Sequence, residues 1–216
     1  MSSRVASGKS RTVGVAVVGL AVASLAGCSG RPGRVSPPDV DADSAAAAAL
    51  AEYDRDGDSQ LKGEELAACP ALAHALIVYD ADKDDALSQQ EIAAGINRWS
   101  TGKMGAISLP FRITLDGRAL GGAEVKLIPE ALLDGAVKPA GGVANAGGSG
   151  FLGMSAEDRP SNLPNLPLVQ PGLFRVEITH PSRNVPAKFN VDTTLGLETA
   201  VASQNPAGIE WSLRSK

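Results

Sequence analysis

The chain has 216 residues, of which 20% are charged and 4% aromatic, and its formal net charge at pH 7 is −4. This acidic balance argues against nucleic acid as a partner, since phosphate backbones are bound by clustered basic side chains. The scarcity of aromatic residues argues against a large aromatic-lined cleft for catalysis or sugar binding, and the length suits one or two small domains.

Residues 1–28 have the composition of a secretory leader. They contain three basic residues, no acidic one, and an apolar run from Val13 to Ala26 that is too short to span a bilayer comfortably. The run ends in "LAGC", residues 25–28, which resembles the bacterial lipobox. The resemblance implies that Cys28 receives a lipid and becomes the first residue of a protein anchored at a membrane surface. The alternative is an ordinary secretory signal that contains a cysteine by chance.

Residues 29–42 are rich in Pro, Gly and Ser and are predicted to form a flexible tether. Ser29 is not the aspartate that retains some lipoproteins at the inner membrane, which favours the outer membrane or the cell surface. Loss of a leader with three positive charges would change the formal charge from −4 to −7. Cys69 would then be the remaining cysteine, so the fold cannot depend on an internal disulfide.

Residues 43–100 are predicted to form a small helical region. An alanine-rich run up to Tyr53 favours a first helix with Asp43 or Ser44 as its N-cap, although the same run also suits a low-complexity spacer. Further helices are predicted over residues 64–68, 70–79 and 89–99. Pro70 ends the second helix and suits the first turn of the third.

Two segments of this region, 54–65 and 80–91, repeat acidic residues at the same offsets. A calcium ion takes six to eight oxygen ligands, and a loop of 12 residues supplies them from positions 1, 3, 5, 7 and 12. The first loop offers Asp54, Asp56, Asp58, the carbonyl of Gln60, and Glu65. The second loop offers Asp80, Asp82, Asp84, the carbonyl of Ala86, and Glu91. With an apolar Leu61 or Leu87 at position eight, the two segments resemble an EF-hand pair, and they predict two calcium sites.

Both loops depart from that family at position six, where Ser59 and Asp85 replace glycine. A side chain at the positive φ of this turn costs roughly 1 kcal/mol. Lys62 at position nine of the first loop also offsets the local negative charge. We therefore predict weak sites, with Kd of about 10⁻⁴ to 10⁻³ M and the second site tighter. The alternative is a pair of solvated acidic turns that hold no metal, and magnesium fits less well because it demands a tighter octahedron.

After "STGKMGA", residues 100–106, the pattern changes from helical to alternating. Strands are predicted over residues 107–115, 123–128, 151–155, 173–179, 197–202 and 209–213. Short strands without intervening helices predict an antiparallel β-sandwich, so the expected fold class is α+β, with an EF-hand pair (43–100) followed by a sandwich (105–214). The segments 140–150 and 158–172, rich in Gly and Pro, are predicted to be long surface loops.

Three stretches carry a second resemblance: "FRITLDGRALGGAEVKLIPE", "PGLFRVEITHP" and "PAKFNVDTTLGLETAV". They are similar to transthyretin-like, carboxypeptidase regulatory-like β-sandwich domains of bacterial surface lipoproteins. The family often has an acid-rich turn before the glycine and aromatic residue of its middle strand, whereas "SGF" at residues 149–151 lacks the acid. The resemblance implies a spacer, adhesion module or partner of a larger enzyme, and no catalytic residues.

The sequence contains no familiar catalytic motif. His74 and His180 are predicted to be ordinary, partly exposed residues, and Cys69 a buried, inert thiol. We therefore expect a non-enzymatic, calcium-binding envelope lipoprotein whose sandwich contacts a cell-surface protein or polysaccharide. The alternative is an accessory subunit or a hydrolase that binds substrate through the long loops. Two close carboxylates in a pocket there, Glu157 and Asp158 opposite Glu130, would favour that alternative.

Overall fold

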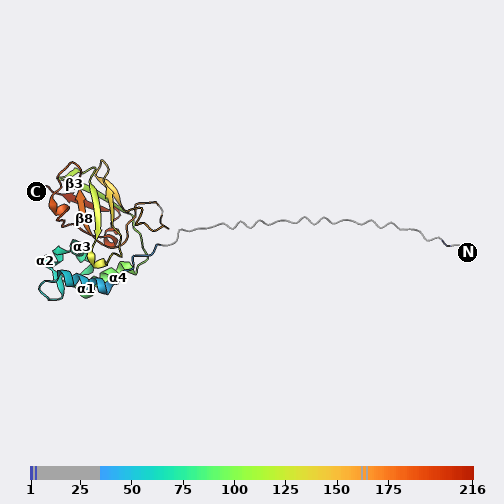
Figure 1. Cartoon of the computed structure of the whole chain (residues 1–216), viewed down its shortest axis with the longest axis horizontal. Helices are drawn as coiled ribbons and strands as arrows, with labels where there is room; N and C mark the ends of the chain where they lie inside the picture. The colour runs from blue at the N-terminus through green and yellow to red at the C-terminus, as the bar shows by residue number, and fades with distance from the viewer. Residues whose placement is uncertain (2, 4–34, 162, 164) are drawn as a thin grey trace. The chain divides into compact units, whose positions relative to one another are not determined.

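The computed structural model describes residues 1, 3, 35–161, 163 and 165–216. Cys28, the predicted lipidation site, lies outside these residues. The described part has a mixed α+β fold in which short helices come first along the chain and a mostly antiparallel sheet follows (Figure 1). Within it, no helix has both the length and the apolar character that a membrane crossing requires.

The first half of the fold is helical. Its elements are α1 (Ala42–Tyr53), β1 (Gln60–Lys62), α2 (Gly63–Ala68), α3 (Pro70–Tyr79), β2 (Ala86–Ser88) and α4 (Gln89–Ser100). The alanine run is helical, as predicted, because alanine loses no side-chain freedom in a helix. The predicted N-cap of α1 was wrong. Asp41, rather than Asp43 or Ser44, caps the helix, and its carboxylate accepts a hydrogen bond from the Ser44 amide at 2.9 Å.

The second half of the fold is a sheet of eight strands. They are β3 (Leu109–Leu115), β4 (Arg118–Ala119), β5 (Glu124–Pro129), β6 (Ala140–Val143), β7 (Ser149–Met154), β8 (Leu173–Thr179), β9 (Gly196–Glu198) and β10 (Ile209–Leu213). The strand order is β10-β3-β7-β6-β5-β8-β9, with β4 paired to β3. The connections carry the short helices η1 (Ala131–Leu133), η2 (Ala187–Phe189) and α5 (Thr199–Ala202). The expectation of antiparallel strands holds for every pair of these strands except β10 and β3, which run parallel.

The glycine-rich segment 140–150 differs from its prediction. It was expected to be a surface loop, but it contributes β6 and the start of β7. The glycines allow close approach of neighbouring backbones, since a Cβ at Gly141 would lie 2.6 Å from the carbonyl oxygen of Val125 and one at Gly142 would lie 2.3 Å from that of Phe151. The missing side chains therefore favour the sheet here rather than a loop.

The predicted strand over residues 197–202 was also wrong in its second half. It ends at Glu198, and the chain continues as α5. The Glu198 carboxylate accepts hydrogen bonds from the amides of Ala200 at 3.1 Å and Val201 at 2.5 Å, which caps the helical turn. The proline-rich segment 158–172 is a loop, as predicted, and the part of it that the structure describes has one bridge, from Val169 to Ile107.

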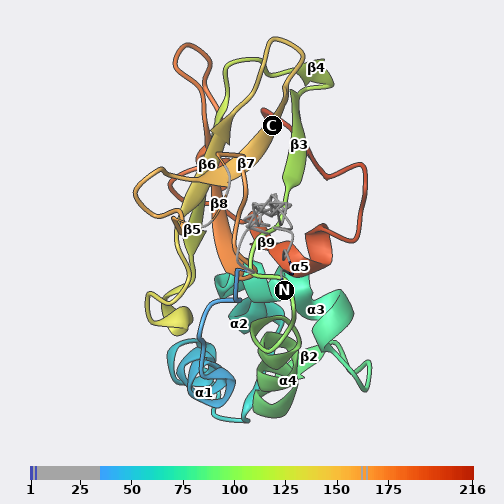
Figure 2. The same ribbon diagram turned by 90° about the vertical axis from the view of Figure 1, so that its right-hand side faces the viewer.

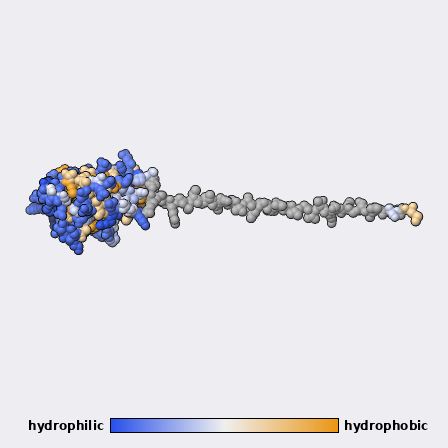
Figure 3. All heavy atoms as spheres, turned by 90° about the horizontal axis from the view of Figure 1, so that it is seen from below, coloured by the Kyte–Doolittle hydropathy of each residue, from blue (hydrophilic) through white to orange (hydrophobic). Residues whose placement is uncertain are grey.

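The helices and the sheet share one hydrophobic core. Inward-facing residues alternate along β5 and β8 as the sequence predicted, namely Val125, Leu127, Phe174, Val176 and Ile178, and all of them are buried. Trp211 and Leu213 of β10 are also buried, as expected. By contrast, the outer face shown in Figure 3 is mostly hydrophilic.

The helical half lies at one end of the strands, where α3 packs on β8 and β9 (Figure 2). The approach is close at Gly196, where a Cβ would lie 1.8 Å from the carbonyl oxygen of Pro70. The amide of Glu198 also donates a hydrogen bond to Nδ1 of His74 on α3, at 3.2 Å. The two halves of the described chain are therefore packed together through backbone contacts as well as through apolar side chains.

Candidate metal centre

The first acidic loop gathers four carboxylates. Asp54 is the C-cap of α1, and Glu65 lies in the first turn of α2. One carboxylate oxygen from each of Asp54, Asp56, Asp58 and Glu65 lies within 4.8 Å of the others, so the group could hold a metal ion. The structure thus brings together all four acidic ligands that the sequence predicted for this loop. Gln60, whose carbonyl was the fifth, lies next to them in β1.

At position six of each loop the backbone adopts the left-handed conformation that usually requires glycine, although neither loop has a glycine there. Ser59 has φ 68° and Asp85 has φ 63°. In the first loop, Asp54 accepts hydrogen bonds from the amides of Gly57 at 2.7 Å and Ser59 at 3.0 Å. In the second, the Asp85 amide donates to Asp80 at 3.0 Å. Hydrogen bonds to the first ligand therefore hold the turn in place even though position six carries a side chain.

We expect Ser59→Gly to raise the free energy of unfolding of the calcium-loaded protein by roughly 0.5–1 kcal/mol, because glycine adopts φ 68° without steric cost. Ser59→Ala is the matched control, since it removes the same hydroxyl but keeps the Cβ. Urea denaturation of both variants checks the prediction. A gain for Ser59→Ala as large as that for Ser59→Gly would show that backbone strain is not the cause.

Glu65 has one carboxylate oxygen with no partner. The residue is 8% exposed, and its Oε1 accepts hydrogen bonds from the amides of Arg55 at 2.8 Å and Asp56 at 3.2 Å. Its Oε2 is buried and makes no hydrogen bond in the described part of the chain. A buried carboxylate oxygen without a partner is costly, and it needs a cation, a proton or a water molecule to satisfy it. The residues present therefore fit a hard cation bound by oxygen atoms.

Lys62 places a positive charge inside the same loop. Its ammonium forms an ion pair with Asp58 and lies 4.0 Å from Asp56. The hydrogen bond from Lys62 lowers the pKa of Asp58, and the same bond raises the pKa of Lys62. A bound cation must compete with this ammonium for Asp58, which is the charge offset that the sequence indicated.

Lys62→Gln is expected to tighten metal binding by the first loop roughly threefold to tenfold, because it removes the competing charge. Calorimetric titration with calcium measures this in a background that carries Glu91→Gln, so that the first loop is observed alone. Lys126→Gln, an exposed change on β5, is the control for net charge. If both lysine variants tighten binding equally, the effect of Lys62 is not local.

The second loop gathers three carboxylates, from Asp80, Asp82 and Glu91, within 4.8 Å of one another. Asp84, the third predicted ligand, is not in this group. Its Oδ1 accepts a hydrogen bond from the Ala86 amide at 2.9 Å, and its Oδ2 accepts one from the side chain of Gln60 at 3.3 Å. This contact between the loops was not foreseen, since the sequence assigned only the Gln60 carbonyl to a site. Partial desolvation, followed by the nearby carboxylates of Asp84 and Glu91, raises the pKa of Asp82.

Glu91 differs from Glu65 because both of its oxygens have partners. Its Oε1 accepts from the Ala81 amide at 2.8 Å, and its Oε2 accepts from the amide and the hydroxyl of Ser88 at 2.9 and 2.8 Å. Ser88 in turn caps α4, which completes a capping box. The sequence favoured the second loop as the tighter site. The geometry adds an opposing feature, because this loop has fewer carboxylates in place and no unsatisfied oxygen on its glutamate.

A short antiparallel ladder joins the two loops. Leu61 of β1 lies opposite Leu87 of β2, and both side chains are fully buried. Lys62 pairs with Ala86, whose carbonyl is a predicted ligand, and Gln60 pairs with Ser88. The apolar position eight of each loop thus packs against its counterpart, so the loops are held as a pair.

No protein-family model matches this chain, and comparisons with the curated proteins and with the solved structures find no similar protein.

Both ring nitrogens of His180 have hydrogen-bond partners. Nδ1 of His180 accepts from the amides of Ser182 and Arg183, and its Nε2 lies 2.9 Å from the carbonyl oxygen of Gly121. Cys69 is buried, and burial raises the pKa of its thiol to about 12, so the reactive thiolate is scarce near neutral pH.

The carboxylates that would favour a hydrolase are not gathered in the pocket of Asp158. In the described residues, this pocket is lined by segments 139–141 and 153–155 and includes neither Glu157 nor Glu130. Glu130 is instead buried, with an Oε1 that makes no hydrogen bond in the described part of the chain. Neither this burial nor that of Glu198, which is fully buried, was predicted from the sequence.

Proposed function

We propose that this chain is a calcium-binding, lipid-anchored protein of the cell envelope that acts by binding rather than by catalysis. In this proposal an EF-hand pair binds calcium, and the metal stabilises helices that are packed on a transthyretin-like interaction module. The observation that carries the metal site is the buried, unpartnered Oε2 of Glu65 beside the carboxylates of Asp54, Asp56 and Asp58.

The chemistry of the ligands supports calcium. Each gathered group offers carboxylate oxygen, and neither loop contains the histidine or cysteine that zinc prefers. A bound calcium ion would neutralise the clustered carboxylates. The loops themselves orient the ligands, since the amides of Arg55 and Asp56 hold Glu65 over the first loop and those of Ala81 and Ser88 hold Glu91 over the second.

The envelope location rests on the leader and on Cys28. The interaction module rests on the resemblance of the three C-terminal stretches, to which the structure adds a tight turn between β3 and β4. Asp116 and Gly117 both have positive φ, at 53° and 77°, as a two-residue hairpin turn requires. We propose a cell-surface protein or polysaccharide as the partner of this module.

Calcium titration by calorimetry on residues 29–216 tests the metal proposal, because this polypeptide contains every helix and strand of the described fold. We expect two ions to bind with Kd of about 10⁻⁴ to 10⁻³ M, with weaker binding of magnesium and a gain of helical circular dichroism. Both sites should be lost in Glu65→Gln/Glu91→Gln. No heat and no change in helix up to about 10 mM calcium, well above that range, would contradict the proposal.

Metabolic labelling with a palmitate analogue in a bacterial host tests the anchor separately. The wild-type chain is expected to carry the label and to fractionate with membranes. Cys28→Ser should lose both properties, whereas Cys69→Ser should retain them. An unlabelled wild-type chain in the soluble fraction would exclude the lipid anchor without affecting the calcium proposal.

A further inference from the structure

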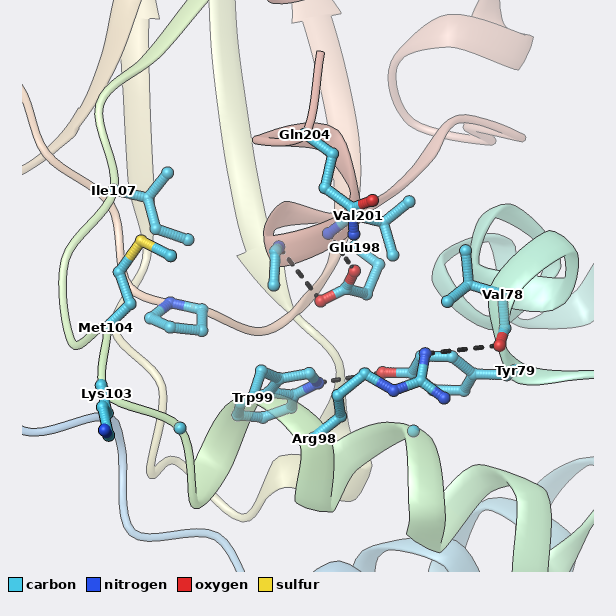
Figure 4. A pocket seen from close by; sticks show the side chains of 14 residues that line it. Val78, Tyr79, Arg98, Trp99, Lys103, Met104, Ile107, Glu198, Val201 and Gln204 are labelled. Carbon is cyan, nitrogen blue, oxygen red and sulfur yellow. Dashed lines mark hydrogen bonds between the residues drawn. The ribbon is translucent and has the colours of Figure 1, made fainter. Parts of the chain in front are cut away.

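A pocket of about 210 Å³ lies between the helical half and the sheet. Its walls come from the end of α3, the second half of α4, segment 102–107 and α5. Figure 4 shows side chains that face one another across it: Tyr79, Trp99, Met104, Ile107, Val201 and Glu198. None of the loop carboxylates lines the pocket, which is therefore separate from the proposed calcium sites.

The size and the walls of the pocket suit a compact apolar group. A cavity of about 150 Å³ lined by apolar side chains admits benzene, so this pocket has room for a substituted ring. The indole N–H of Trp99 is already bound to the Tyr79 hydroxyl at 2.9 Å. Tyr79, Trp99 and Ile107 are buried but line the pocket, and the half-buried Val201 adds aliphatic surface to it.

The charges of the pocket favour an anionic end on its ligand. The guanidinium of Arg98 is exposed and, within the described residues, donates one hydrogen bond, to the carbonyl of Val78 at 3.4 Å. A guanidinium has five N–H donors, which leaves several to bind a carboxylate. Glu198 is fully buried, and both of its oxygens accept backbone amides, so it cannot reach a ligand cation.

We propose that this pocket binds a small carboxylate with a compact apolar body. The apolar part rests between Trp99 and Val201, and the carboxylate lies at the rim against Arg98.

The test uses 4-methylbenzoate as the probe, residues 29–216 as the protein, and the ¹⁵N indole resonances as the signal. We expect a saturable shift of the Trp99 resonance with Kd of about 1 mM and no shift of Trp211, which lies on β10. Neutral 4-methylbenzyl alcohol should bind at least about fivefold more weakly. Ala200→Leu, which fills the pocket, should abolish the shift while the rest of the spectrum stays folded.

Arg98→Gln tests whether Arg98 binds the carboxylate of the ligand. It should remove the preference for the carboxylate over the alcohol, whereas Arg118→Gln, an exposed change on β4, should keep that preference. Equal binding of the two probes to the wild-type protein, tighter binding of 4-methylbenzylamine, or an unchanged preference in Arg98→Gln would overturn the ligand class. No saturable shift up to about 20 mM, well above the expected Kd, would overturn the site.

Discussion

Glu65→Gln is expected to destabilise the protein in calcium, and to leave it as stable as the wild-type protein or more stable when calcium is removed. In calcium at about 100 times Kd, a filled site contributes about 2.7 kcal/mol, which for a chain of this size corresponds to roughly 5–10 °C in Tm. The variant loses this gain at the first loop because glutamine is neutral and cannot bind the ion through two carboxylate oxygens. In chelator, the variant should unfold at the same temperature as the wild-type protein or higher, because it removes a buried charge with an unpartnered oxygen.

Differential scanning calorimetry in calcium and in EDTA measures the Tm of the wild-type protein and of the variant under both conditions. Glu64→Gln is the matched control, since Glu64 precedes Glu65 in α2 but is exposed and outside the gathered group. Its Tm should follow that of the wild-type protein under both conditions. A Glu65→Gln variant that gains as much from calcium as the wild-type protein would show that the first loop is not the site.

Glu198→Gln is expected to flatten the dependence of stability on pH between about pH 5 and 8.5. Burial raises the pKa of Glu198 from 4.5 to about 7, although the amides of Val201 and Ala200 lower it. The folded protein therefore holds a proton more tightly than the unfolded chain, and this stability is lost as pH rises through 7. The loss amounts to about 3 kcal/mol for a shift of this size.

Glu198→Gln also lowers the free energy of unfolding by removing a hydrogen-bond acceptor, and this loss dominates at low pH. Glutamine offers one acceptor oxygen, so one of the two capped amides loses its partner, which costs about 1 kcal/mol. The variant should thus be less stable than the wild-type protein near pH 5 and more stable near pH 8.5. The side chains that act electrostatically on Glu198 or feel its charge are Arg98 and Tyr79, and the ring of His74 accepts a hydrogen bond from the backbone amide of Glu198.

Urea denaturation in saturating calcium at several pH values gives the difference between the wild-type protein and the variant, in which the contributions of groups common to both largely cancel. Glu210→Gln, at an exposed position on β10, is the control. Parallel pH curves for the wild-type protein and Glu198→Gln would mean that Glu198 titrates in the folded state as it does in the unfolded chain.

The helices and acidic loops could be predicted because local chemistry decides them. Alanine-rich sequence, Pro70 at the start of α3 and the Ser88 cap of α4 act within one or two helical turns. The spacing of the loop carboxylates likewise brings Asp54, Asp56 and Asp58 together without help from distant residues.

The features that were missed depend on distant neighbours. The segment 140–150 joins the sheet because the backbones of β5 and β7 lie so close to it that only glycine fits between them. Nothing within the segment indicates these contacts. The parallel pairing of β10 with β3 depends on the path of the chain between these two strands, which the residues of β10 do not indicate. The burial of Glu198 follows from the packing of α3 on β9. The turn of Asp84 toward Gln60 depends on how the two loops are placed side by side.

The pairing of β10 with β3 has a consequence for biosynthesis. Ile209 lies opposite Phe111, 98 residues earlier, so β3 keeps one unpaired edge until the segment 209–213 has been made. An open strand edge is a template for association with other chains. The sheet therefore cannot be completed until this segment has been made, and the growing chain must be shielded or kept extended over this interval. Slowing the delivery of β10 should therefore favour aggregation over folding, even when the earlier helices are already formed.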